Sequence, residues 1–456
     1  MTPPFFFLDR SRIRQGIAFA LFVLLIVGVI PPIHAQDSGI TSSVFRYGPA
    51  RVGEASLELK QPLVLIWKKA LGGQSAFGYF SSSPVAMGGR LFVGASDGVY
   101  ALNAKTGDVV WVYKTEKPVK SSPSISGETL YVGSSDGKVY AIAIANGAKL
   151  WSFKTEGPVI SSPLVAGGVV YAGSEDALLR AIDAKTGVLK WEFKTDLQVT
   201  SSPALAYGTL YVGSWDGYVY ALDPENGQIK WKFYTNHGIE SSPAISDGIV
   251  FIGASYTNRI MALDAYTGKE LWEYATDYKV ISSPAVSGSL VFIGSTDTRI
   301  YALDAKTGAL AWKYNATGGV SGSSATVSGD TVYIGAEDKK IYAFEKSSGK
   351  LIWSFKADES ISSTPLVSNG FLYMTSADNT VYAFSDEETA RSMKLLLQEA
   401  NAANQAIKPP APQQNVDAIG LAPKAPSENS QGQVLAVIGA VAAVMVIVWA
   451  RRRHNT

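Results

Sequence analysis

The chain has 456 residues, with 40 basic and 39 acidic side chains and a formal net charge of +1. This balance excludes the broad basic surface that nucleic-acid-binding proteins use, so we expect no nucleic-acid partner. The sequence contains no cysteine, which excludes disulfides and thiolate metal sites, while its 43 Gly, 22 Tyr and 10 Trp are typical of short strands joined by tight turns.

Residues 1–35 have the features of a secretory signal peptide. Arg10, Arg12 and Arg14 precede an apolar run over residues 16–30, and a cleavage site follows Ala35. The alternative is an uncleaved signal anchor, although this run is shorter than the roughly 20 residues of a typical span. In either case the bulk of the chain is expected outside the cytoplasm. Residues 36–62 are interpreted as a lead-in to the first repeat.

A repeat of about 40 residues occupies residues 63–385. Its first marker is a tryptophan, found at Trp67, Trp111, Trp151, Trp191, Trp231, Trp272, Trp312 and Trp353. Its second marker is Ser-Ser-Pro, and each unit contains four runs of alternating apolar and polar residues separated by Gly-containing turns. Such units predict four-stranded antiparallel blades. Because blades bury their faces against one another, we expect an all-β, eight-bladed β-propeller.

The order of the two markers predicts how the ring closes. Trp67 comes before the first Ser-Ser-Pro, and no tryptophan strand follows Phe384. The strand near residues 63–70 is therefore expected to complete the last blade, which the two ends of the repeat region would share.

The units also share the pattern Ala-x-Asp-x-x-Thr-Gly-x-x-x-Trp, which is complete over residues 181–191, 262–272 and 302–312. The Gly-His and Trp-Asp signature of WD40 repeats does not recur, and kelch repeats are longer. The pattern resembles the tryptophan-docking motif of the quinoprotein-type, PQQ-like repeat propellers. The chain looks closer to the BamB-like scaffold propellers of this group than to its pyrroloquinoline quinone (PQQ) dehydrogenases. The resemblance implies indoles that pack between adjacent blades.

Three segments follow the repeats. Residues 385–388, Ser-Asp-Glu-Glu, resemble a capping box, and residues 386–407 are predicted to form an amphipathic helix. Residues 408–433 are rich in Pro, Ala, Gln and Asn, a composition typical of a flexible stalk. Residues 434–450 are apolar and precede three arginines, which predicts a transmembrane helix with a cytoplasmic basic tail at 451–456. We expect a single-pass cell-membrane protein with an extracytoplasmic propeller.

The resemblance implies one of two functional classes, PQQ-dependent dehydrogenases or non-catalytic scaffolds. It implies that the enzymes carry adjacent cysteines beside the quinone and hold Ca²⁺ with carboxylates and amides, whereas this chain has no cysteine. The links between blades are short, and His237 is the only histidine between the two termini. We expect no catalytic, cofactor-binding or metal site, and PQQ with Ca²⁺ is the alternative.

Two repeated polar features are interpreted as structural. The turn aspartates, such as Asp97 and Asp136, suit hairpin turns better than a metal site. The Ser-Ser pairs are predicted on the innermost strands, where their hydroxyls would line a water-filled central channel.

Positions that break the repeat indicate where a partner binds. Such positions are the long first link, the extra tryptophan and the insertion near residue 256, and we predict that they share one face. The candidate interaction residues are Phe77, Tyr79, Trp215, Tyr218, His237, Tyr256 and Arg259. Aromatic and arginine side chains are typical of protein-binding hot spots, and local packing of odd loops is the alternative. We hypothesise a non-enzymatic, membrane-anchored scaffold for proteins or envelope polymers; a PQQ-binding redox protein is the competing hypothesis.

Overall fold

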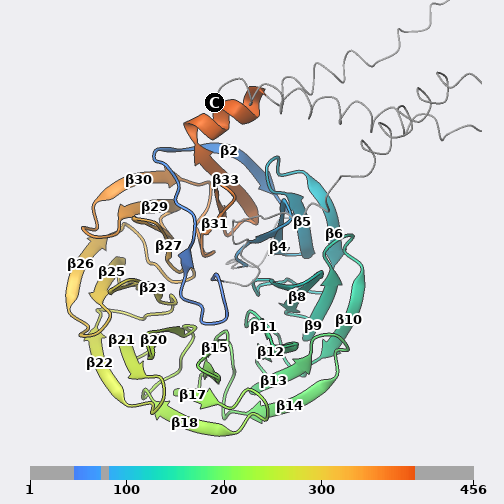
Figure 1. The fold of residues 1–456 in the computed structure, drawn as a ribbon, viewed down its shortest axis with the longest axis vertical. Coiled ribbons are helices and arrows are strands. Elements are labelled where there is room, and N and C mark those ends of the chain that lie inside the picture. Colours follow the sequence, from blue (N-terminus) through green and yellow to red (C-terminus); the bar gives the residue numbers. More distant parts are fainter. Residues whose placement is uncertain (1–45, 73–81, 396–456) are drawn as a thin grey trace, which may run out of the picture. The chain divides into compact units, whose positions relative to one another are not determined.

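The computed structural model describes residues 46–72 and 82–395. They form eight antiparallel blades arranged around one axis (Figure 1). Seven blades are each built from consecutive strands, and one of these also carries β1 (Glu54–Ala55) as a fifth strand. The eighth combines β31, β32 and β33 with β2. The predicted eight-bladed β-propeller of four-stranded blades is confirmed.

Four strands follow one another from the axis to the rim of each blade. The innermost strands are β3 (Val85–Met87), β7 (Ser124–Ser126), β11 (Leu164–Ala166), β15 (Ala204–Ala206), β19 (Ala244–Ser246), β23 (Ala285–Ser287), β27 (Thr326–Ser328) and β31 (Leu366–Ser368). The second strands are β4 (Arg90–Ala95), β8 (Thr129–Ser134), β12 (Val169–Gly173), β16 (Thr209–Gly213), β20 (Ile249–Ala254), β24 (Leu290–Gly294), β28 (Thr331–Gly335) and β32 (Phe371–Thr375). The third strands are β5 (Gly98–Asn103), β9 (Lys138–Ala143), β13 (Leu178–Asp183), β17 (Tyr218–Leu222), β21 (Arg259–Asp264), β25 (Arg299–Asp304), β29 (Lys340–Glu345) and β33 (Thr380–Asp386). The outermost strands are β6 (Val109–Lys114), β10 (Lys149–Lys154), β14 (Leu189–Lys194), β18 (Ile229–Tyr234), β22 (Glu270–Ala275), β26 (Leu310–Asn315), β30 (Leu351–Lys356) and β2 (Leu63–Ala70).

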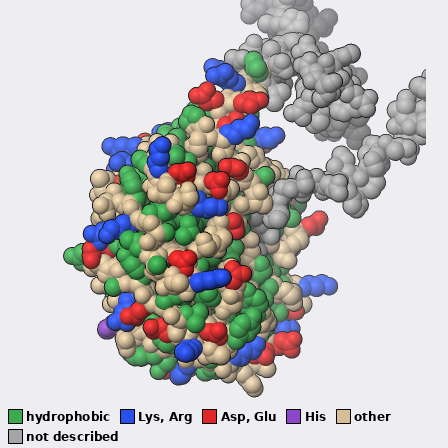
Figure 2. Space-filling model, turned by 60° about the vertical axis from the view of Figure 1, so that its left-hand side comes forward, with side chains coloured by type: hydrophobic (Ala, Val, Ile, Leu, Met, Phe, Trp, Pro, Cys, Tyr) green, Lys and Arg blue, Asp and Glu red, His purple; other side chains and the backbone are tan. Residues whose placement is uncertain are grey.

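The burial of the strands follows their place in the blade. The second strand β8 reads TLYVGS and is buried at all but its first position, because both of its faces touch neighbouring blades. The outermost strand β10 reads KLWSFK and alternates between exposed and half-buried positions. Charged side chains are interspersed with apolar ones on the outside of the ring (Figure 2). Lysines such as Lys149 and Lys154 at the ends of these edge strands disfavour pairing with another chain.

The hydrophobic core is divided among the seams between blades. The described residues contain eight apolar clusters, and each combines side chains of two adjacent blades. One cluster, for example, packs Val85 and Phe92 of the first blade against Leu130 and Val132 of the second. The core is therefore a ring of similar interfaces, as repeat architecture requires.

Tryptophans dock every seam, as the resemblance implies. Each indole Nε1 donates a hydrogen bond of 2.8–3.2 Å to a backbone carbonyl of the next blade: Trp67 to Ala104, Trp111 to Ile144, Trp151 to Ala184, Trp191 to Pro224, Trp231 to Ala265, Trp272 to Ala305, Trp312 to Lys346 and Trp353 to Leu63. The motif glycine lies against the indole. A Cβ on Gly308 would lie 2.7 Å from the Trp272 ring, so a side chain is excluded there.

The ring closes through β2, as predicted. This strand pairs antiparallel with β33, in a register that places Leu63 opposite Asp386 and Ala70 opposite Thr380. β2 therefore completes the last blade, and its ladder with β33 has one irregularity, between Leu65 and Trp67.

Residues 46–55, here called the strap, run through the centre of the ring (Figure 1). Four strap carbonyls accept hydrogen bonds from the middle residues of four successive innermost strands: Pro49 from Leu205, Ala50 from Ile245, Val52 from Val286 and Gly53 from Val327. The strap ends in β1, which pairs in parallel with β27. The prediction of a water-filled channel is wrong for the part that the strap occupies, because polypeptide satisfies the inward-facing N–H groups there.

A helix over residues 387–395 follows the last blade. Its N-cap is Asp386, whose Oδ1 accepts the backbone N–H of Thr389 at 2.8 Å. Ser385, the expected first residue of a capping box, still belongs to β33 and donates its hydroxyl to Gly370 O at 2.6 Å.

The predicted signal peptide, stalk, transmembrane helix and basic tail lie outside the described residues, as do positions 396–407 of the predicted amphipathic helix. Within residues 46–72 and 82–395, no helix is long and apolar enough to cross a membrane.

Candidate interaction site at the mouth of the channel

A cavity of about 380 Å³ opens at one mouth of the central channel. One hydroxyl residue of each blade lines it: Ser83, Ser122, Ser162, Ser202, Ser242, Ser283, Ser324 and Thr364. Seven hydrogen bonds of 2.8–3.0 Å link these residues around the axis, each from the backbone N–H of one to the side-chain oxygen of a neighbour. We call this set the hydroxyl ring.

The preceding Ser of each pair has a second structural role. Its hydroxyl oxygen accepts a backbone N–H from the second strand of its own blade at 2.7–3.4 Å, as in Gly94 N to Ser82 Oγ. Both serines of the motif therefore satisfy backbone donors. A nucleophilic serine requires an adjacent base, and no histidine lines the cavity among the described residues.

Trp215 and Tyr256 meet at one side of the mouth. They belong to the β16–β17 and β20–β21 turns of adjacent blades, and their ring centroids are 5.6 Å apart. Trp215 donates its Nε1 hydrogen to Thr200 Oγ1 at 2.8 Å, and Lys279 Nζ lies 4.0 Å from the centre of the Tyr256 ring. Glu240 lines the cavity beside Trp215. Burial, followed by the charge of Glu240, raises the pKa of Tyr256 above its ordinary value.

We call Trp215, Glu240, Tyr256 and Lys279 the mouth cluster. The two aromatic side chains are half-buried and Lys279 is exposed, so the cluster presents aromatic surface and charge to solvent. Trp and Tyr side chains with polar neighbours are typical anchors of protein interfaces.

The other described candidate residues lie at the same end of the ring but do not line the cavity. Tyr218 packs against Tyr234, with centroids 4.9 Å apart, and Arg259 forms an ion pair of 2.5 Å with Glu273, so both side chains contact the outermost strand of their own blade. His237 is exposed in the link between β18 and β19. None of these three lines the cavity. Phe77 and Tyr79 fall outside the described residues.

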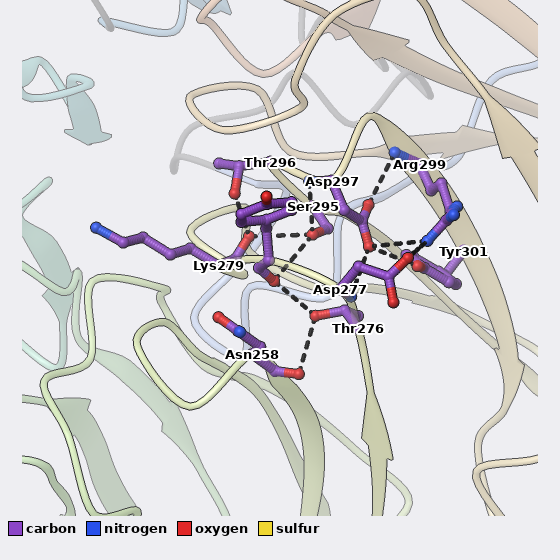
Figure 3. A network of polar contacts seen from close by, with 10 residues as sticks. Asn258, Thr276, Asp277, Lys279, Ser295, Thr296, Asp297, Arg299 and Tyr301 are labelled. Atoms are coloured by element: carbon purple, nitrogen blue, oxygen red, sulfur yellow. Dashed lines mark hydrogen bonds and ion pairs between the residues drawn. The ribbon is translucent and has the colours of Figure 1, made fainter.

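The turn aspartates fix the turns to the blade links, as Figure 3 shows for one blade. Asp297 Oδ2 accepts the hydroxyl of Tyr301 at 2.6 Å and the backbone N–H of Asp277 at 3.1 Å, while Arg299 bonds the Asp277 carboxylate. Burial, and then the bond to Asp297, raises the pKa of Tyr301 above its ordinary value. The same Tyr-to-Asp bond recurs in other blades.

The end of the ring that carries the mouth cluster is rich in carboxylates. The turns between second and third strands and the links between blades share this end, since Trp215 N, for example, donates to Gln198 O at 3.0 Å. These segments contain Lys117, Lys120, Lys279 and Lys339 but many more acidic residues: Asp97, Glu116, Asp136, Glu156, Glu175, Asp176, Asp196, Asp216, Glu240, Asp277, Asp297, Glu337, Asp338, Asp358, Glu359 and Asp378. Seven of these carboxylates form ion pairs, for example Asp97 with Lys114 and Glu116 with Lys138, and the other nine have no ion-pair partner among the described residues. We call this end the acidic face.

The donor set at the mouth does not fit PQQ with Ca²⁺. A calcium ion requires about six to eight converging oxygen ligands. Within residues 46–72 and 82–395, no three His, Asp or Glu side chains form such a group. Two carboxylates, Glu175 and Glu240, and one lysine, Lys120, line the cavity, so its charged lining is net negative, which disfavours the carboxylates of the quinone.

The strap was missed by sequence reasoning. Arg51 Nη2 donates to Ser162 O at 2.9 Å, and its Nε donates to Pro203 O, so a buried guanidinium crosslinks two blades. Burial, and to a lesser extent the charge of Arg46, lowers the pKa of Arg51 to about 9. The only indication of the strap in the sequence was the pair of arginines in a Gly-containing stretch before the first strand. This stretch has no periodicity from which its position could be predicted.

Comparisons with known proteins agree with this architecture. A family model described as outer membrane protein assembly factor BamB matches residues 64–159, 124–236, 215–325 and 316–416. The solved structure of BamB from Moraxella catarrhalis is similar, with a TM-score of 0.61 and 20% identity over 71% of this chain and 100% of that chain. A search of curated proteins found no match.

Redox enzymes share the same fold. The quinohemoprotein alcohol dehydrogenase ADHIIG from Pseudomonas putida HK5 is similar, with a TM-score of 0.66 and 14% identity over 76% of this chain and 80% of that chain. A europium-containing methanol dehydrogenase has a TM-score of 0.66 and 13% identity over 77% and 99% of the two chains. At these identities the structural likeness shows the fold alone. Because the family matches extend from residue 64 to residue 416, the chain belongs to the family of the outer membrane protein assembly factor BamB.

Proposed function

We propose that this protein is a non-enzymatic, membrane-anchored extracytoplasmic scaffold that binds a protein partner on its acidic face. The mouth cluster is the observation that carries the proposal. Trp215 and Tyr256 offer aromatic surface in a rim of carboxylates, and both residues depart from the otherwise regular repeat. A partner of matching chemistry presents a basic surface with an apolar or aromatic group at its centre.

The chemistry of the mouth supports a scaffold over an enzyme. The hydroxyl ring satisfies backbone donors, His237 does not line the cavity, and the donor set does not fit the quinone. Membership of the BamB family supports a role in assembling other proteins. The sequences of residues 1–35 and 434–450 support export and anchoring.

Site-specific cross-linking in native membranes tests the binding face. A photoreactive amino acid at Trp215 is expected to give one discrete adduct, and its yield should fall as salt screens the acidic face. The matched control is Tyr207, which is about half exposed and follows an innermost strand at the opposite end of the ring. Equal adduct patterns from the two positions would contradict the proposal.

Titration with PQQ and Ca²⁺ tests the competing redox function. The scaffold proposal expects no saturable change in quinone absorbance and no rise in the unfolding temperature of the full-length chain. Saturable binding with thermal stabilisation would instead favour the redox protein.

A further inference from the structure

Arg46 carries a buried guanidinium that has no partner in the part of the chain that the structure describes. Its residue is only 3% exposed, and none of Nε, Nη1 and Nη2 has a hydrogen-bond acceptor among the described residues. It lies inside the ring, because its carbonyl accepts the N–H of Gly53 at 3.3 Å and the adjacent Tyr47 contacts Val367 of the innermost strand β31. Burial of an unpaired charge costs several kcal/mol, so such a group is normally neutralised by an anion.

No carboxylate near Arg46 supplies that charge within the described residues. Burial is the sole cause that lowers the pKa of Arg46 to about 9, and no acidic residue offsets it. The neighbouring charge is another arginine, Arg51, which itself donates to the carbonyls of Ser162 and Pro203. Two guanidiniums therefore give the centre of the ring a positive potential, in contrast to the acidic face at its mouth.

The backbone around Arg46 and Arg51 reinforces this arrangement. Arg46 and Arg51 have φ values of +62° and +54°, a left-handed conformation that is unfavourable for residues with side chains. Tyr47, at +63°, shares it. The strap thus maintains local strain while directing two cations into a protein interior.

Further donors face the same channel. In β15 the middle residue Leu205, opposite Leu210, points its N–H at the strap. The same register position in β3, β7 and β11 is held by Ala86, Ile125 and Val165. Within the described part of the chain, no strap carbonyl accepts a hydrogen bond from the N–H groups of these three residues. Three adjacent blades therefore present backbone N–H groups that a ligand oxygen could accept.

We propose that the centre of the ring is a binding site for a small oxyanion, with Arg46 as its principal ligand. A guanidinium presents forked donors that match the oxygens of a phosphate or a carboxylate, so the ligand class is a compact oxyanion such as inorganic phosphate. The site is independent of partner binding on the acidic face. In this proposal the strap holds Arg46 in place, and the bound anion neutralises its buried charge.

Inorganic phosphate is the probe, and the unfolding temperature of the full-length chain is the readout, at constant ionic strength set with NaCl. The wild type is expected to show a saturable rise in unfolding temperature, because phosphate binds the folded state. Arg46→Met should abolish this rise. Arg46→Lys keeps the charge but loses the fork, and its affinity for phosphate should fall by about 10-fold or more. Arg391→Met, which removes an exposed guanidinium from the terminal helix, should respond as the wild type does.

Several outcomes would overturn the proposal. An equal phosphate response in Arg46→Met and the wild type would exclude Arg46 as the ligand. If Arg46→Met does not fold, equal phosphate affinities of Arg46→Lys and the wild type would exclude it as well. A wild type that ignores phosphate would also refute the site.

Discussion

Substitution of Gly308 tests the tryptophan-docked seams quantitatively. Gly308 has a φ of +71°, and a Cβ there would lie 2.7 Å from two carbons of the Trp272 ring. Alanine therefore brings about 1–2 kcal/mol of backbone strain. The indole, only 8% exposed, must also move, which costs roughly 1–3 kcal/mol of overpacking. Displacement of the 2.9 Å bond from Trp272 Nε1 to Ala305 O removes about 1 kcal/mol more.

Gly288 in the same blade is the matched control. Its φ is +58°, but a Cβ there meets no atom within 4 Å, so Gly288→Ala carries the backbone strain alone. Urea unfolding followed by tryptophan fluorescence should place Gly308→Ala about 2–4 kcal/mol below Gly288→Ala. Equal midpoints for the two variants would refute the view that the glycine is required by the indole.

Further predictions concern ion pairs and the seam between the last two blades. Arg180→Met leaves the buried Asp176 carboxylate without its 2.8 Å partner and should lower the free energy of unfolding by about 3–5 kcal/mol. Burial raises the pKa of Asp176, but bonds from Arg180 and Ser174 outweigh it and lower the pKa overall. This stabilisation is fully present above the unfolded-state pKa of about 4 and is lost as the pH falls through the lower folded-state pKa. The urea midpoint of Asp176→Asn, measured from pH 7 to pH 2, should therefore fall less steeply at acid pH than that of the wild type. Lys68→Ala should change stability by less than about 1 kcal/mol, because its pair with Asp358 is exposed; a larger loss in urea unfolding would contradict this. Trp353→Phe should destabilise the seam between the last two blades by about 1 kcal/mol, because it removes the hydrogen bond to Leu63 O. A urea midpoint equal to that of the wild type would contradict this prediction.

The sequence predicted the parts of the fold that repeat. Because a blade cannot bury its faces alone, the recurrence of Trp and Ser-Ser-Pro determined both the architecture and the blade count. The position of Trp67 ahead of the first Ser-Ser-Pro also determined the closure through β2. Trp215 and Tyr256 were identified because they break the repeat, and they touch because equivalent turns of adjacent blades are neighbours.

Features set by single long-range contacts were not predictable in this way. The strap has no periodicity, and its carbonyls pair with residues about 150 to 275 positions away, so nothing local indicates its place. Tyr218 and Arg259 were predicted to share one face with Trp215 and Tyr256. They open their strands directly opposite Tyr234 and Ala275, and this register brings their side chains against the outermost strand, a detail that the break in the repeat did not indicate.

The shared last blade also determines how the ring resists a pulling force. The chain leaves the propeller at Asp386, the end of β33, and β33 is bonded to β32 on one side and β2 on the other. Tension applied beyond Asp386 acts along a strand clamped on both sides, so extraction requires two ladders to shear together instead of one edge peeling open bond by bond. Closure of the ring by β2 thus places the point at which the chain leaves the propeller inside a sheet and not at its edge.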